Sequence, residues 1–300
     1  MVWLFAWGLA LASVDGPFEA RVHTEDVARF YEVFETRHEP GFARRLGRDY
    51  LRAGSPALQK FRRRIGSARA LARTVLRSED YYIRLQPQLL ALDESSLGLG
   101  DLYEDMAQIW PAAVFPDVHI LVGRFMSGGT IADEGILIGG ELFGRTAEVD
   151  GTALPGWLDE GLKSIDEVEA IVAHELIHYQ QDMAEKHRLA LVLEEGVADF
   201  FAELLVGRHI NPVAHAYGEK HEPELQAAFC PGRHAEGAGS WLYVPSTEPG
   251  VPKDLGYYIG YRIAEDYVTG AADRTTAVRE LLVVQDAEGI LQASGWCEGY

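Results

Sequence analysis

The sequence HELIH at residues 174–178 decides how the rest of the chain is interpreted. Residues 164–167 (SIDE) have the form of a capping box and precede apolar residues at helical spacing, so we expect one long helix that includes HELIH. His174 and His178 are four residues apart, so both imidazoles project from one face of that helix and can bind one metal ion. Glu175 lies beside them, where a carboxylate can take a proton from a metal-activated water and deliver it to a leaving group.

A catalytic zinc ion usually has three protein ligands and one open position, so we expect a third ligand from elsewhere in the chain. Residues 193–200 (LEEGVADF) provide Glu195 and Asp199 on a helix expected over about 189–205, which ends at Gly207. An antiparallel second helix would bring these carboxylates back to the histidines. At i, i+4 spacing, one carboxylate can bind the metal while the other hydrogen-bonds a ligand imidazole.

HELIH followed by EEGVADF resembles the gluzincin arrangement of zinc metallopeptidases, as in thermolysin-like proteases and the related zinc aminopeptidases. The resemblance implies a zincin-like fold and one Zn²⁺ per chain, with Glu195 as the third ligand beside the two histidines and Glu175 as the general base. It implies that Asp199 hydrogen-bonds a ligand imidazole. The metzincin arrangement is excluded, because Gln181 and Ala184 occupy the positions of its glycine and third histidine.

Other stretches extend the resemblance over most of the chain, although they are looser motifs than HExxH. They are YLRAGSPALQKF (50–61), GGT (128–130) with GILIGGELF (135–143), and LGYYIGYRI (255–263). They are similar to predicted bacterial zinc-dependent proteases related to the gliding-motility lipoprotein B group, which implies a metallopeptidase-like domain. No cysteine precedes Cys230, so we expect no lipid anchor.

Two β-branched runs, residues 118–123 and 135–139, are separated by a turn region and are expected to be neighbouring strands of a small antiparallel sheet. Such enzymes bind peptides along a sheet edge above the zinc, which would place Gly139 and Gly140 beside the substrate; an ordinary hairpin is the alternative. In the related aminopeptidases a glutamate near this point holds the substrate's amino terminus. The resemblance implies that role for Glu141.

The helix expected over residues 255–267 contains a YxxG element that is similar to the aminopeptidase segment whose tyrosine stabilises the tetrahedral intermediate. Tyr257 is the matching position. The alternative is that the aromatic residues of this helix only pack, with Gly260 allowing a close approach. Downstream histidines at 215, 221 and 234 are either proton donors or surface residues.

The 300 residues are 47% hydrophobic and 24% charged, which is typical of a globular chain. The fold class expected is α+β and predominantly helical, with one domain and helical lobes over residues 13–300. Further helices are expected to start after Thr24 and at Ser55 and to cover 68–76, 81–92, 275–284 and 287–294.

With 27 Lys and Arg against 46 Asp and Glu, the net charge of −19 disfavours nucleic acid as a partner. No apolar run reaches the roughly 18 residues of a membrane span.

Residues 1–12 (MVWLFAWGLALA) have the apolar run and small-residue end of a short signal peptide, although the usual positive charge is missing. We therefore expect a secreted or periplasmic protein; a buried first helix and a cytoplasmic location are the alternative. Export would allow Cys230 and Cys297 to form a disulfide, and two buried thiols are the alternative.

The sequence thus predicts a zinc metallopeptidase that hydrolyses a peptide or protein substrate. A zincin-fold assembly or interaction factor that keeps its zinc site is the alternative, and the intact Glu175 argues against it. A metal-free helical binding protein would require the capping box, HExxH and EEGxAD to occur in this order by coincidence.

Overall fold

The computed structural model describes residues 20–146, 154, 161–183 and 185–300. About 58% of these residues are helical, and a small mixed sheet of four strands completes an α+β fold. The expected leader over residues 1–12 lies outside the described residues. Among the helices described, none is long and apolar enough to cross a membrane.

The strands are short and the helices carry most of the chain. The strands are β1 (Val22–His23), β2 (Val118–Leu121), β3 (Gly129–Ala132) and β4 (Gly135–Gly139). The helices are α1 (Glu25–Phe34), α2 (Phe42–Arg45), α3 (Pro56–Ile65), α4 (Ala68–Arg77), α5 (Glu79–Leu90), α6 (Leu99–Ile109), α7 (Val168–Gln180), α8 (Arg188–Val206), α9 (Pro212–Phe229), α10 (Leu255–Gly270), α11 (Arg274–Leu282) and α12 (Ala287–Ser294). Single turns of 3-10 or π geometry cover Leu46–Tyr50, Gly140–Leu142, Ile165–Glu167 and Cys230–Gly232.

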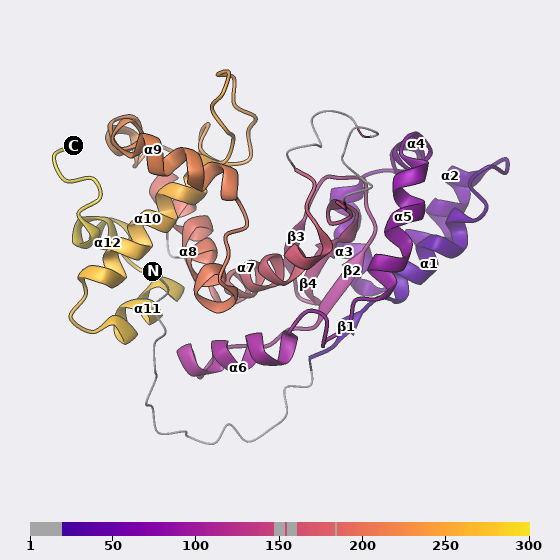
Figure 1. The fold of residues 1–300 in the computed structure, drawn as a ribbon, viewed down its shortest axis with the longest axis horizontal. Helices are drawn as coiled ribbons and strands as arrows, with labels where there is room; N and C mark the ends of the chain where they lie inside the picture. The colour runs from indigo at the N-terminus through magenta and orange to yellow at the C-terminus, as the bar shows by residue number, and fades with distance from the viewer. Residues whose placement is uncertain (1–19, 147–153, 155–160, 184) are drawn as a thin grey trace.

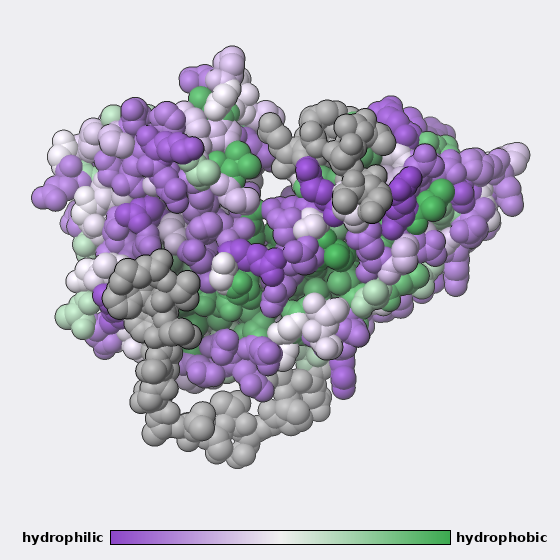
Figure 2. Space-filling view, in the orientation of Figure 1, coloured by the Kyte–Doolittle hydropathy of each residue, from purple (hydrophilic) through white to green (hydrophobic). Residues whose placement is uncertain are grey.

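Two groups of helices lie on either side of a central region (Figure 1). Helices α1 to α5 lie beside the sheet at the right, and α8 to α12 form the left end. α7 runs between them, and buried apolar side chains from both groups form one continuous cluster. The face in Figure 2 is hollowed between the groups, and apolar residues gather there.

The sheet has the order β1-β2-β4-β3. β1 and β2 are parallel, β2 and β4 are parallel, and only β3 and β4 are antiparallel. The expected small antiparallel sheet is therefore wrong, although residues 118–121 and 135–139 are neighbours as predicted. The turn region between them contains the start of β3, which forms an antiparallel hairpin with β4. β4 therefore lies between β2 and β3, and it runs parallel to β2 instead of antiparallel to it.

Local signals in the sequence explain where the helices of the central region begin and end. The capping box at Ser164 and Glu167 is formed, and its 3-10 turn leads directly into α7. Ser55 accepts a hydrogen bond from the N–H of Leu58 at the start of α3. α8 ends at Gly207, whose φ of 74° is the left-handed conformation that glycine adopts without strain.

A disulfide joins Cys230, after α9, to Cys297, after α12. The sequence left this bond and two free thiols as alternatives. The two cysteines are 67 residues apart, and closing a loop of that length stabilises a fold by about 4 kcal/mol in the chain-entropy model. The bond therefore fastens the last three helices to α9.

Candidate metal centre

α7 carries His174, Glu175 and His178 through the middle of the molecule. Its side chains are apolar on nearly all sides, as in a helix that other elements cover completely. The sheet packs on one side of it and α8 on the other. Burial on both sides holds the two imidazoles in place, because their helix has little freedom to move.

Three donor atoms converge where α7 meets α8. The Nε2 atoms of His174 and His178 are 2.9 Å apart, and they lie 3.3 and 3.4 Å from Oε2 of Glu195. Ligand atoms at about 2.0–2.1 Å from a tetrahedral zinc ion lie about 3.3 Å from one another. The spacing and the donor types therefore fit a zinc ion with three protein ligands and one open position. We call His174, His178 and Glu195 the metal centre.

A hydrogen-bond chain fixes the His178 ring. Its Nδ1 donates to Oε1 of Gln181 at 2.6 Å, and Nε2 of Gln181 donates to the carbonyl of Glu194 at 2.8 Å. Because the amide of Gln181 is oriented by Glu194, its oxygen faces the imidazole and Nδ1 carries the proton. The lone pair of Nε2 is then free for a metal. In the sequence, Gln181 served only to exclude the metzincin arrangement, and its contact with His178 was not predicted.

The charges of the metal centre also favour a cation. Burial opposes ionisation of Glu195, but hydrogen bonds from both histidines outweigh it and lower the pKa of this carboxyl well below its usual value. Burial likewise opposes a charge on His178, yet Glu195 raises the pKa of His178 to about 9. Without an ion, the buried Glu195 carboxylate thus favours a proton on His178. A divalent ion bound at the same place would supply this positive charge instead.

Glu175 faces the sheet next to the metal centre and is only 8% exposed. It packs on Gly129 of β3, where a Cβ atom would overlap the Glu175 carboxylate. Burial raises the pKa of Glu175 above its usual value, against the opposing charges of His178 and His174. A carboxylate with a raised pKa beside a metal is suited to exchange protons near neutral pH.

Residues 153–291 match the model of a family described as predicted Zn-dependent protease (DUF2268). The match covers just under half of the chain. It includes the metal centre and helices α7 to α11, and it leaves out the sheet and helices α1 to α6. No curated protein and no solved structure matches the chain.

Two tyrosines reach the metal centre from the other side. The ring of Tyr257 on α10 stacks on His174, with centroids 5.9 Å apart and an interplanar angle of 24°. Burial and the charge of Glu195 raise the pKa of Tyr257 well above its usual value, so its phenol stays protonated. Tyr243 donates a hydrogen bond to Oε1 of Glu195. Sequence reasoning missed Tyr243 because it lies in a long loop without periodic pattern.

The next two tyrosines of α10 have hydrogen-bond partners outside the metal centre. Tyr258 donates to Glu222 at 2.6 Å, and Tyr261 donates to Glu203. Of Tyr257, Tyr258 and Tyr261, the structure thus brings only Tyr257, the position that matches the YxxG element, to the metal centre.

The α10 helix approaches α8 at two glycines. A Cβ atom on Gly196 would overlap the backbone of Gly260, and one on Gly260 would overlap the carbonyl of Val192. The close approach expected at Gly260 is therefore present. It places Tyr257, one turn earlier on α10, over the helix that carries Glu195.

Asp199 does not hydrogen-bond either histidine of the metal centre. Its carboxylate accepts from Nε2 of His215 at 2.7 Å and from the N–H of Ile210 at 2.9 Å. The expected contact with a ligand imidazole is therefore wrong: the short connection from α8 to α9 brings His215 against Asp199 instead. Nδ1 of His174 is buried without a hydrogen-bond partner among the residues that the structure describes.

The positions expected to bind substrate are also corrected. Glu141 is buried, and it accepts hydrogen bonds from the N–H groups of Gly123 and Phe125 at 2.7 and 2.8 Å. Burial raises the pKa of Glu141 to about 7, and the two N–H donors oppose that rise. Gly139 and Gly140 lie at the end of an inner strand, packed against Phe61 and Leu89. These three residues therefore hold the fold together and do not form a sheet edge beside the metal centre.

Proposed function

We propose that the protein is a zinc-dependent metallopeptidase that hydrolyses peptide bonds, with one Zn²⁺ bound at the metal centre. The observation that carries the proposal is the convergence of Nε2 of His174, Nε2 of His178 and Oε2 of Glu195. The buried carboxylate of Glu175, which is not one of these ligands, lies next to them. The gluzincin arrangement has these features, and the description of the matching family supports the same activity.

The side chains have separate roles in this proposal. When bound, the zinc ion supplies a Lewis acid that lowers the pKa of a coordinated water and polarises the scissile carbonyl. Glu175 takes a proton from the attacking water and returns it to the departing amine nitrogen. Tyr257 donates a hydrogen bond to the oxygen of the carbonyl as negative charge develops there. Gln181 keeps the His178 ring in the required orientation.

The substrate is proposed to add to β3. This strand is one of the two edge strands of the described sheet, and Gly129 at its start contacts Glu175. An extended peptide can form backbone hydrogen bonds along such an edge, with its scissile bond close to the carboxylate of Glu175. β3 thus takes the role that the sequence assigned to Gly139 and Gly140.

Removal of the metal tests the proposed function. Incubated with a peptide library, the zinc-loaded protein is expected to produce cleavage products detectable by mass spectrometry. Chelator-treated protein is expected to produce none until zinc is restored. A zinc-loaded protein that cleaves no peptide would instead favour the assembly or interaction factor.

Tyr257→Phe tests the proposed hydrogen bond to the carbonyl oxygen. We expect unchanged zinc content and a kcat that falls by about 10²–10³, because one donor to a developing oxyanion is worth that much. KM should change less, since the bond forms mainly in the transition state. Tyr258→Phe and Tyr261→Phe are matched controls on the same helix. If Tyr257→Phe is silent and Tyr243→Phe slows the reaction, Tyr243 is the donor.

The compartment is proposed to be oxidising, outside the cytosol. The Cys230–Cys297 disulfide supports this proposal, because such bonds persist in secreted and periplasmic proteins. Removal of residues 1–12 on export is part of the same proposal.

A further inference from the structure

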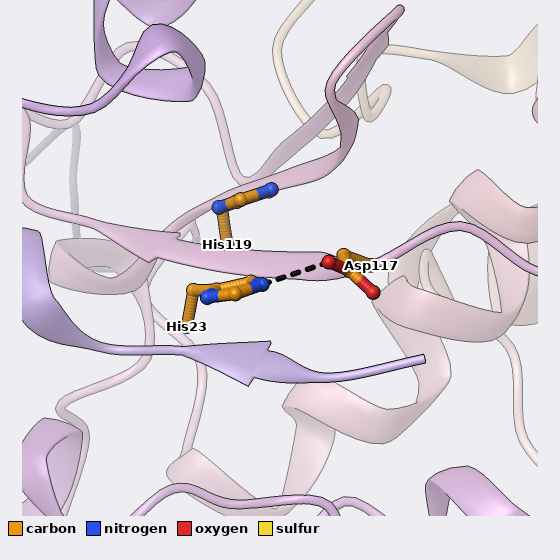
Figure 3. A group of neighbouring side chains, drawn as sticks. All are labelled: His23, Asp117 and His119. Carbon is orange, nitrogen blue, oxygen red and sulfur yellow. Dashed lines mark hydrogen bonds and ion pairs between the residues drawn. The ribbon is translucent and has the colours of Figure 1, made fainter. Parts of the chain in front are cut away.

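A second group of potential metal ligands lies on the sheet, outside the region that the protease family matches (Figure 3). His23 of β1 pairs with His119 of β2 in the parallel ladder. Side chains alternate between the faces of a strand, so Asp117, two residues before His119, points to the same face. The register of β1 against β2 thus brings these three side chains together. We call them the β1–β2 cluster.

The three side chains are close enough to share an ion. Nε2 of His23 lies 2.8 Å from Oδ2 of Asp117, and one donor atom from each residue lies within 4.8 Å of the others. The imidazole rings are parallel, with centroids 4.5 Å apart, and Asp117 lies at the same end of both rings (Figure 3). Binding of one ion requires the rings to turn out of this stacked arrangement, so that one nitrogen of each points to the ion.

His119, one member of the cluster, has a buried ring nitrogen that nothing in the described chain satisfies. Nε2 of His119 donates to the carbonyl of Glu134 at 3.1 Å, whereas Nδ1 of His119 is buried without a partner in the described residues. A buried nitrogen with a free lone pair is costly in a metal-free fold. Glu25 lies 3.6 Å from Nδ1 of His23, where a carboxylate can hold the proton on that nitrogen while Nε2 binds an ion.

The cluster is also reachable from solvent. The side chains of His23 and Asp117 are 31% and 39% exposed. An ion can therefore enter, and water can fill the coordination positions that the protein leaves open. Two imidazoles and one carboxylate favour zinc, nickel or copper over magnesium or calcium, which prefer all-oxygen sites.

We propose that His23, Asp117 and His119 form a second divalent-metal site, for a transition ion such as Zn²⁺, that fastens β1 to the sheet. β1 has two residues and pairs only with β2 in the described sheet. Beside the His23–Asp117 contact, the N–H of Arg21 just before β1 donates to Asp117 at 2.9 Å, and the N–H of Val22 donates to Glu94 at 3.0 Å. An ion bound by His23, Asp117 and His119 would replace the single His23–Asp117 contact with a link of three side chains, which strengthens the attachment of so short a strand.

The test separates this site from the metal centre. The full chain, without a histidine tag, is stripped with chelator and titrated with Zn²⁺ by calorimetry in a His174→Gln/His178→Gln background. One ion is expected to bind, and zinc is expected to raise the Tm. Adding His119→Gln is expected to weaken that binding at least tenfold and to abolish the rise in Tm. The protein with wild-type His174 and His178 should bind two ions, and one when only His119 is replaced.

His38→Gln is the matched control. His38 also lies against a carboxylate, 2.9 Å from Glu79, but the group contains no second histidine. We expect zinc binding in the same background to be unchanged by this substitution. The proposal is overturned if that background binds no zinc, if His119→Gln leaves its affinity unchanged, or if His38→Gln weakens binding equally. Circular dichroism of the metal-free variants shows that each comparison is made on folded protein.

Discussion

Glu175→Gln is expected to keep its zinc and to lose hydrolysis. The amide has nearly the shape of the carboxylate and fills the same space against Gly129, so the fold and the metal centre should not change. It cannot take a proton from water, and positioned acid–base help contributes roughly 10²–10⁴ in rate. We expect kcat to fall by about that factor, measured on a peptide that the wild-type protein cleaves, with zinc content followed by elemental analysis.

Glu169→Gln is the control for this substitution. Glu169 lies on the same helix, where it pairs with Arg208 at 3.3 Å, away from the metal centre. Its replacement makes the same chemical change on the same helix and should leave kcat within twofold. Undiminished hydrolysis by Glu175→Gln would show that the proton is transferred by another group.

Glu195→Ala is expected to empty the metal centre. Without the carboxylate, two imidazoles 2.9 Å apart remain, and two neutral ligands cannot close a zinc site. We expect one zinc ion fewer per chain than in the wild-type protein and no detectable hydrolysis. The affinity loss should exceed the roughly 10–100-fold cost of removing an outer hydrogen-bond partner.

Gln181→Ala provides the graded comparison. Gln181 orients His178 without touching the ion, so its removal should weaken zinc binding by about 10–100-fold and leave the stoichiometry unchanged at saturating zinc. Equal metal affinity in Glu195→Ala and the wild-type protein would show that Glu195 is not a ligand.

Local signals in the sequence predicted most helices of the described chain. These signals, such as Ser55 with Pro56, the capping box and Gly207, each act within a few residues of a helix end. The helix boundaries they set can therefore be predicted without knowledge of the tertiary structure. Helices α2, α6 and α9 were not predicted; in α9, Pro223 and a non-helical His221 interrupt the pattern. The direction of β4 could not be predicted either, because it depends on β3, a strand of four residues with partly exposed side chains.

In the candidate site, too, residues positioned by one helix could be predicted, and residues positioned by packing between distant segments could not. His174, Glu175 and His178 lie on one helix, so their arrangement depends on helical periodicity alone. Tyr243 reaches Glu195 across 48 residues of chain, from a position with a φ of 65° that no sequence pattern marks. Asp199 has a partner on the following helix, and only the packing of that helix decides between His215 and a ligand imidazole.

The glycine contact between α8 and α10 limits how the metal centre can adapt to different substrates. Because backbone touches backbone at Gly196 and Gly260, we expect the helix with Glu195 and the helix with Tyr257 to move together. Neither helix can shift to fit a larger or smaller substrate without breaking that contact. Adjustment to different substrates must therefore occur on the opposite wall, in β3, and in the loop that carries the 65% exposed Tyr243.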